Sequence, residues 1–197
     1  MKDQPYIVIM AGGVGSRFWP YSKSSKPKQF FDVLGTGRTL LQMTFDRFRE
    51  IAPAEQFYVV TNQAHAGLVS EQLPELLDHQ ILAEPLRKNT AACLAYAAYK
   101  ISNLDPNATM VVAPADHLIL QEGRFLQTLV TSIAAAQVHN RLLTIGIKPN
   151  RPETGYGYIQ YLQNAEDKEV LKVKTFTEKP NAKLATTFLE SGDFVWN

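Results

Sequence analysis

The chain contains, near its start, the glycine-rich stretch Met10-Ala11-Gly12-Gly13-Val14-Gly15-Ser16-Arg17-Phe18-Trp19-Pro20. It follows the apolar run Tyr6-Ile7-Val8-Ile9, whose length and β-branched content predict a buried first strand. Because glycine has no Cβ and tolerates positive φ, a glycine turn after such a strand brings backbone N–H groups against a phosphate. The stretch therefore predicts a phosphate-binding turn.

Positive charge is concentrated directly after this turn. No Asp or Glu occurs between Asp3 and Asp32, so nothing in the segment neutralises its cations. We therefore expect a loop that binds several phosphates of one ligand, as in a triphosphate. The cations are Arg17, Lys23, Lys26 and Lys28, and for Lys23 and Lys26 a solvated surface position is an equal alternative.

Two common phosphate-binding motifs are excluded. A Walker loop requires Gly-x-x-x-x-Gly-Lys-Ser/Thr, and no Lys-Ser/Thr follows these glycines at that spacing. A dinucleotide fingerprint requires Gly-x-Gly-x-x-Gly opening a helix directly, whereas Gly13-x-Gly15 is followed by Phe18-Trp19-Pro20 and a long basic loop. Both interpretations therefore fail, and Gly-Gly-x-Gly alone is weak evidence, because many tight turns have this pattern.

Composition limits the broad class. A length of 197 residues with 45% hydrophobic content predicts one domain with one core, and a net charge of +1 gives no reason to expect nucleic acid or membrane as partners. The only cysteine, Cys93, lies in an apolar helical pattern and is expected to be a buried thiol. Without a signal peptide pattern or a membrane-length apolar run, we expect a cytoplasmic location.

Strands and helices alternate along most of the chain. This order predicts an α/β fold with a Rossmann-like, mostly parallel sheet, helices on both faces and right-handed crossovers. Ligands of such sheets bind outside the carboxyl ends of the strands, so the glycine turn, residues 84–90 and Asp116 should gather at one edge. The expected strands are 6–9, 56–61, 79–83, 109–113 and 142–146, and the expected helices run from a cap at Thr39 towards Pro53, over 63–77, over 91–101 and through Phe125, Leu129 and Ile133.

The period changes from Gly155 onward. Residues 156–162 and 168–177 alternate between apolar and polar side chains, which predicts antiparallel strands laid over the open site. Residues 182–190 predict a short helix, and residues 194–197 begin an apolar strand.

The joint motif resembles the signature of the sugar-1-phosphate nucleotidyltransferases. It combines Gly-Gly-x-Gly with Ser16-Arg17, Trp19-Pro20 and Pro27-Lys28-Gln29-Phe30, and the last two details look like the guanylyltransferases that act on mannose 1-phosphate. The resemblance implies the nucleotide-diphospho-sugar transferase fold and transfer of GMP from GTP to mannose 1-phosphate, with pyrophosphate released. Two alternatives stay open: thymidylyl or uridylyl transfer to glucose 1-phosphate, and a nucleotide-sensing module without turnover.

The resemblance also implies residue roles around the triphosphate. Arg17 would bind the β- and γ-phosphates, and Lys28 would lie as a point charge between the sugar phosphate and the α-phosphate; both would be catalytic. Asp116 would bind Mg²⁺. The alternative is a purely structural role as the N-cap of the next helix, which is common for an Asp that follows a strand. The nucleotide-binding turn would comprise Ala11, Gly12, Gly13, Gly15, Ser16 and Arg17.

Further segments resemble the family's nucleoside and sugar sites. Residues 84–91 match the segment that holds the nucleoside, where Glu84, Asn89 and Thr90 are the candidates and helix capping by Asn89 or Thr90 is the alternative. The candidates for sugar binding are Gly155, Tyr156, Gly157, Glu178, Lys179 and Asn197.

The resemblance covers essentially the whole chain, but relatives continue beyond the position of Asn197. Residues 1–197 are therefore expected to be a nucleotidyltransferase catalytic domain truncated at its C-terminal end. The missing part of such a domain would include a second metal-binding aspartate, so we expect weak or no turnover by this piece alone. A homodimer is the assembly considered for the full-length protein.

Overall fold

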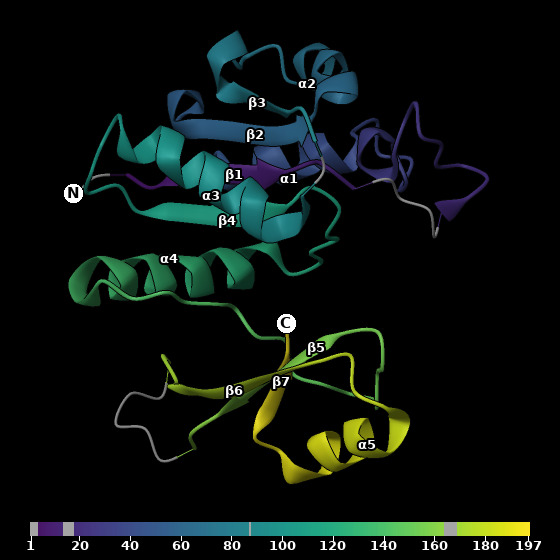
Figure 1. Cartoon of the computed structure of the whole chain (residues 1–197), viewed down its shortest axis with the longest axis vertical. Helices are drawn as coiled ribbons and strands as arrows, with labels where there is room; N and C mark the ends of the chain where they lie inside the picture. Colours follow the sequence, from purple (N-terminus) through teal and green to yellow (C-terminus); the bar gives the residue numbers. More distant parts are fainter. Residues whose placement is uncertain (1–3, 14–17, 87, 164–168) are drawn as a thin grey trace. The chain divides into compact units, whose positions relative to one another are not determined.

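Strand β1 (Tyr6–Met10) lies inside a four-stranded parallel sheet with the order β3-β2-β1-β4 (Figure 1). Its neighbours are β2 (Phe57–Asn62) and β4 (Met110–Pro114), and β3 (Ile81–Glu84) pairs with the far side of β2. Ile7 pairs with Phe57 on one side and with Val111 on the other. The sheet confirms the predicted first strand and the parallel α/β fold.

The computed structural model describes residues 4–13, 18–86, 88–163 and 169–197. The chain divides into two compact units, Met1–Glu122 and Gly123–Asn197. The parallel sheet belongs to the first unit.

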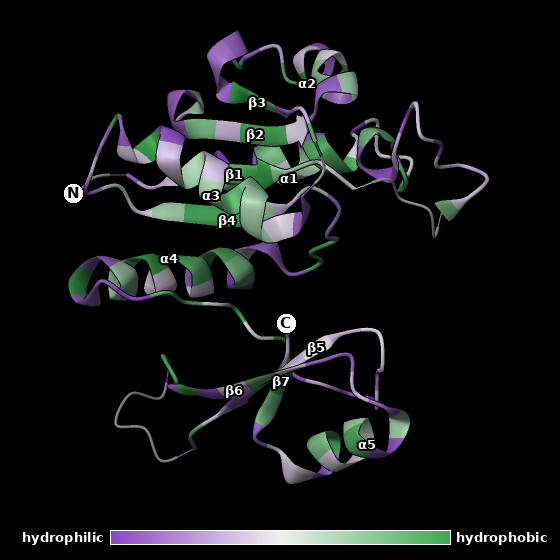
Figure 2. Ribbon diagram, viewed as in Figure 1, coloured by the Kyte–Doolittle hydropathy of each residue, from purple (hydrophilic) through white to green (hydrophobic). Residues whose placement is uncertain are grey.

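Alternation along β1 distributes its side chains to the two faces of the sheet. Ile7 pairs with Phe57, whose ring centroid lies 4.6 Å from that of Phe45 in helix α1 (Leu40–Phe48). Val8 packs instead with Cys93 of helix α3 (Asn89–Ser102). Helices therefore cover both faces, as predicted, and the strands between them are mostly hydrophobic (Figure 2).

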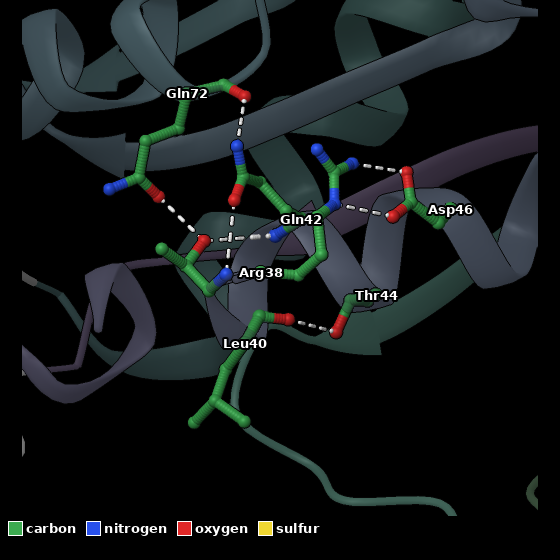
Figure 3. A network of polar contacts seen from close by, with 7 residues as sticks. Arg38, Leu40, Gln42, Thr44, Asp46 and Gln72 are labelled. Carbon is green, nitrogen blue, oxygen red and sulfur yellow. Dashed lines mark hydrogen bonds and ion pairs between the residues drawn. The ribbon is translucent and has the colours of Figure 1, made fainter. Parts of the chain in front are cut away.

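The start of α1 is held by a reciprocal cap (Figure 3). Thr39 Oγ1 accepts a hydrogen bond from the Gln42 amide at 3.2 Å, and Gln42 Oε1 accepts from the Thr39 amide at 3.0 Å. Thr39 Oγ1 also donates to Gln72 Oε1 at 2.7 Å, while Gln72 Nε2 donates to Phe30 O at 3.1 Å. The predicted cap is confirmed, and it also anchors the short helix η2 (Lys28–Phe30).

The helix expected over 63–77 is shorter than predicted. It consists of η4 (Gln63–His65) followed by α2 (Ala66–Gln72). Pro74 explains the early end, because proline lacks an N–H and disfavours the helical conformation in the residue before it. The described residues of this unit also contain the short 3₁₀ helices η3 (Ala54–Gln56) and η5 (Asp78–Gln80).

The second unit contains a three-stranded antiparallel sheet in the order β6-β5-β7. The core packs Tyr158 against Ala185, Phe194 and Trp196. The predicted antiparallel segment and its short helix are thereby confirmed. Its elements are β5 (Gly157–Tyr161), β6 (Val173–Glu178), α5 (Ala182–Ser191) and β7 (Phe194–Trp196). Helix α4 (Glu122–His139) begins at the boundary between the two units.

The strand predicted over 142–146 is wrong. Among the described residues this segment joins no β-ladder, and the Leu142 side chain is fully exposed. The next residue, Ile147, forms an isolated antiparallel bridge with Trp196. An apolar run forms a strand only where a neighbouring strand can pair with its backbone N–H and C=O groups. Here the first such pairing is that of Ile147 with Trp196.

None of the helices in the described part of the chain combines the length and the apolar character that crossing a membrane requires.

Candidate functional site

Polar groups gather at the carboxyl edge of the parallel sheet. Gly12 and Gly13 follow β1, Glu84 is the last residue of β3, and Asp116 follows β4. A Cβ placed on Gly12 would lie 3.9 Å from Glu84 Oε2, so the carboxylate faces the glycine turn. The predicted gathering at one edge is confirmed for these described residues, because parallel strands end on the same side.

Lys28 reaches across this edge to Asp116. Its Nζ lies 3.5 Å from Asp116 Oδ2 and 3.4 Å from the Asp116 main-chain oxygen. The ring of Phe18 lies on another side, with its centroid 4.8 Å from Nζ. The Lys28 side chain is 22% exposed and that of Asp116 is 47% exposed, so both remain accessible to a ligand.

Asp116 supplies a single carboxylate at this position. No group of three or more His, Cys, Asp or Glu side chains within the described ranges could hold a metal ion on its own. A hard divalent cation commonly takes one or two carboxylates and completes its shell with phosphate oxygens and waters. The donor chemistry around Asp116 fits such a cation when a phosphorylated ligand is bound.

His117, next to Asp116, favours its neutral form. Desolvation by surrounding protein atoms lowers the pKa of its imidazole, the Asp116 carboxylate raises it, and Lys28 and Arg47 lower it further. A neutral ring adds no positive charge beside Lys28.

Arg47 holds the segment that follows Asp116. Its guanidinium is 2% exposed, and its Nε donates to Glu122 Oε1 at 2.8 Å. The pair ties α1 to the residue that ends the Asp116–Glu122 segment. Sequence reasoning missed this contact because arginine on an amphipathic helix is usually solvent-exposed.

Asn89 and Thr90 open helix α3 at the end of the candidate nucleoside segment. The N-cap is Lys88, for which the described residues show no side-chain cap hydrogen bond, so the capping alternative for Asn89 and Thr90 is wrong. Asn89 has a φ of 67°, a left-handed conformation that asparagine tolerates better than most residues. Both side chains are exposed and available to a ligand.

Cys93 lies one helical turn further into the core. Burial, assisted by the Glu84 carboxylate, raises the pKa of its thiol to about 11. The expected buried thiol is therefore confirmed.

Part of the predicted phosphate site lies outside the described residues. This applies to Gly15, Ser16 and Arg17, whose roles stay predictions.

The candidate sugar residues of the second unit come together around Gly157. It pairs with Glu178 across the β5–β6 ladder, and a Cβ on Gly157 would lie 2.9 Å from Glu178 Oε2. The same Cβ would lie 3.4 Å from Asn197 Cβ, and the Asn197 amide donates to Gly157 O at 2.9 Å. The absence of a side chain at Gly157 therefore leaves room for the Glu178 carboxylate and Asn197.

Lys179 and Tyr156 border this cluster. Lys179 Nζ lies 2.9 Å from Glu178 Oε1, and the Lys179 amide donates to Tyr156 O at 3.2 Å. The Tyr156 ring packs edge-on against Trp196 with 5.3 Å between centroids. Trp196 Nε1 is buried without a hydrogen-bond partner in the part of the chain that the structure describes.

Gly155 belongs to the adjoining turn. Its amide donates to Glu153 Oε1 at 3.0 Å, and this hydrogen bond, together with Arg151, lowers the pKa of the Glu153 carboxyl. Gly155 thus helps to fix the chain before β5, and its contact with a sugar stays a prediction.

A glycine turn beside a lysine and a carboxylate, all at the carboxyl edge of a parallel sheet, defines an α/β protein for phosphorylated ligands. The family follows from comparison: residues 6–197 match the model of the nucleotidyl transferase family, and the chain belongs to this family. Members of this family generally use a divalent metal ion.

Several relatives are similar over nearly the whole chain. A mannose-1-phosphate guanylyltransferase of Escherichia coli is 40% identical over 96% of this chain and 42% of its own length. The xanthan biosynthesis protein XanB of Xanthomonas campestris is also 40% identical over 96% of the chain, which covers 40% of that protein. The chain therefore spans less than half of these curated relatives.

A solved structure shares the fold. The crystal structure named as a mannose-1-phosphate geranyltransferase from Thermus thermophilus superposes with a TM-score of 0.86 at 30% identity. The match covers 99% of this chain and 56% of that one. The predicted nucleotide-diphospho-sugar transferase fold is confirmed.

Glu122→Gln removes the counter-charge of the buried Arg47 guanidinium. We expect the free energy of unfolding to fall by about 1–2 kcal/mol, because a buried charge loses a charged hydrogen-bond partner. Asp46→Asn is the matched control. Like the Arg47 pair, the pair of Asp46 with Arg38 involves α1, but both of its side chains are exposed, so its loss costs at most about 1 kcal/mol. Urea unfolding followed by circular dichroism measures both changes, and equal losses would contradict this interpretation.

Proposed function

We propose that the protein transfers GMP from GTP to mannose 1-phosphate, giving GDP-mannose and pyrophosphate. The proposal is carried by the contact of Lys28 with Asp116 beside the glycine turn, in a chain whose relatives include mannose-1-phosphate guanylyltransferases. In this reaction a phosphate oxygen of the sugar attacks the α-phosphorus in line with the departing pyrophosphate. One P–O bond forms, the bond to the β-phosphate oxygen breaks, and the electron pair leaves with pyrophosphate.

Both reactants are anions, so alignment and charge neutralisation make up most of the catalysis. Lys28 would hold its ammonium between the sugar phosphate and the α-phosphate, where negative charge from both partners meets. Asp116 would hold the divalent ion, for which we propose Mg²⁺; the ion would neutralise phosphate oxygens. Arg17, whose planar guanidinium suits paired phosphate oxygens, would bind the β- and γ-phosphates.

The nucleotide would lie along the carboxyl edge of the parallel sheet. Ala11, Gly12 and Gly13 would present backbone to the phosphates, with Gly15 and Ser16 continuing the turn. Guanine offers a ring N–H and an amino group as donors and O6 as an acceptor. Glu84, Asn89 and Thr90 would read this pattern, and a base that leaves their polar groups unpaired would be rejected.

The mannose would bind at the Gly157 cluster. Glu178 would accept hydrogen bonds from sugar hydroxyls, and Asn197 would contact the ring from the neighbouring strand. Lys179 would exchange its ion pair with Glu178 for the sugar phosphate, while Gly155, Tyr156 and Gly157 would admit the ring. The support is the short distance between these residues, which come from three different strand ends.

A coupled pyrophosphate-release assay on the full-length protein tests the proposal. We expect turnover with GTP, Mg²⁺ and mannose 1-phosphate, and rates lower by at least about 100-fold with dTTP or UTP and glucose 1-phosphate, because the wrong base leaves buried polar groups unpaired. Preference for the glucose pair would support the alternative transferase. Nucleotide binding without pyrophosphate release from any pair would support the sensing module.

Lys28→Ala and Asp116→Asn should abolish most of the transfer while the fold is preserved. We expect kcat to fall by about 10²–10³ for Lys28→Ala, because a cation is lost where transition-state charge accumulates. Lys26→Ala is the matched control in the same loop, since Lys26 lies over the Phe31 ring rather than beside Asp116. Stopped assays with circular dichroism distinguish the variants, and unchanged turnover in Lys28→Ala would refute the assigned role.

Gly157→Ala should weaken sugar binding selectively. The added Cβ would meet Glu178 Oε2 at 2.9 Å, so the carboxylate must move. We expect KM for mannose 1-phosphate to rise about tenfold while KM for GTP stays unchanged, since a misplaced methyl group in a binding pocket has effects of this order. Gly123→Ala is the control, because among the described residues no atom beyond its chain neighbours and its own helix backbone lies within 4 Å of its Cβ position. Equal KM values for both variants would argue against a sugar site here.

The proposal places the reaction in the cytoplasm, where nucleoside triphosphates are available. A homodimer of the full-length protein stays a prediction, as does weak turnover by residues 1–197 alone.

A further inference from the structure

We propose that Gln29 is a positioning residue for the nucleotide: its side-chain amide binds the two carbonyls that flank Gly12 and thereby turns the Gly12 N–H towards the phosphates. This inference rests on the proposed function, because it explains how the glycine turn of that site is held in a conformation that can bind phosphates. It concerns a residue that contacts the turn rather than the reacting atoms.

Gln29 is a buried amide, 3% exposed, that lies against the start of the turn. Its Nε2 donates to Ala11 O at 2.8 Å and to Gly13 O at 3.1 Å. A side-chain amide nitrogen carries two hydrogens, and here one is directed at each carbonyl. A single side chain therefore determines the orientation of both peptide oxygens.

The first of these carbonyls is held from a second direction. Thr61 Oγ1, at the end of β2, donates to Ala11 O at 3.0 Å. The Ala11 amide in turn donates to Val60 O at 2.8 Å. Ala11 is thus attached to β2 through its N–H and its C=O, and Gln29 completes the coordination of its oxygen.

The fixed direction of the Ala11 carbonyl also fixes the direction of the Gly12 N–H, because both belong to the same peptide group. In a trans peptide the C=O and the following N–H point in opposite directions. Because Ala11 O points to Gln29 and Thr61, the Gly12 N–H points away from them. No described residue accepts a backbone hydrogen bond from this amide. A backbone N–H without an acceptor among the described residues, at the carboxyl edge of the sheet, is suited to an anionic oxygen of a ligand.

The short helix that carries Gln29 is anchored to its surroundings. Helix η2 follows Pro27, and Phe30 within it is fully buried and receives the Gln72 hydrogen bond through its carbonyl. Gln29 turns inward from this helix to the glycine turn, while the adjacent Lys28 reaches Asp116. One short helix therefore positions both the backbone donor and the catalytic ammonium.

Only an uncharged side chain with two donors on one nitrogen meets this requirement. Glutamate has nearly the same shape, but its carboxylate would face two carbonyl oxygens and would repel them. Methionine has a similar length and no donor, so it would leave both carbonyls without this hydrogen bond. Asparagine retains the amide on a side chain shorter by one methylene.

Gln80 offers a matched control in the same unit. It is 1% exposed, and its Nε2 donates to Ala54 O and to Phe57 O, both at 2.7 Å. Phe57 begins β2, so Gln80 makes the same two-carbonyl contact at the amino edge of the sheet, away from the phosphate turn. Comparing Gln29→Met with Gln80→Met therefore separates a general loss of stability from a specific loss of GTP binding.

The experiment measures GTP–Mg²⁺ binding by calorimetry, KM and kcat, and amide hydrogen exchange in Gln29→Met, Gln29→Asn and Gln80→Met of the full-length protein. We expect Gln29→Met to raise the Kd for GTP at least about tenfold, with a smaller rise for Gln29→Asn. KM for mannose 1-phosphate should change little. Exchange of the Ala11 amide, which donates to Val60 O, should accelerate in the Gln29 variants only, and Gln80→Met should bind GTP as the wild type does.

Each result has a distinct meaning. GTP affinity equal to wild type in folded Gln29→Met or Gln29→Asn would overturn the role of Gln29 and leave the proposed function standing. An equal loss of affinity in Gln80→Met would also overturn it, because the effect would then reflect general destabilisation. A wild-type protein that binds no GTP would overturn the proposed function and this inference with it. Should Gln29→Met fail to fold, Gln29→Asn decides between the first two outcomes.

Discussion

The parallel pairing of β1 with β2 and β4 is the constraint on which the site of the first unit depends. The backbone of β1 is paired on both sides by these two neighbours, and its side chains are buried on both faces by α1 and α3. Strands that run the same way end at the same edge, so the chain leaves β1, β3 and β4 beside Gly12, Glu84 and Asp116. Gly12 and Asp116 are more than 100 positions apart in the sequence, and they reach the same edge because β1 and β4 pair directly.

Buried amides complete what the strand pairing begins. Gln29 holds the turn that leaves β1, and Gln80 holds the entrance to β2. Each is nearly inaccessible to solvent and donates to two backbone carbonyls, of which Ala11 O and Ala54 O also accept a second hydrogen bond. Loss of one such hydrogen bond costs about 0.5–1.5 kcal/mol, so these amides add to the apolar core in fixing local geometry. The difference is that only the Gln29 contact borders the candidate phosphate site.

In the second unit, antiparallel strand pairing brings together the residues around Gly157. Antiparallel register places Gly157 opposite Glu178, and β7 brings Asn197 against the other side of β5. The Glu178 carboxylate occupies the space that a Cβ on Gly157 would need, so its exposed side chain would have to shift to admit one. The glycine therefore lets the polar groups that we assign to the sugar lie close together.

The sequence by itself determined the strand and helix order of the first unit, the Thr39 cap and the carboxyl-edge position of Glu84 and Asp116. These features follow from periodicity, turn residues and caps, which act within a few residues. Only the tertiary structure showed that residues 142–146 join no sheet and that Lys88 is the N-cap of α3. It also decided which groups the side chains of Gln29 and Arg47 contact. Strand formation requires a partner backbone, and the contacts of these two side chains join segments 16 to 75 residues apart, so no local pattern encodes them.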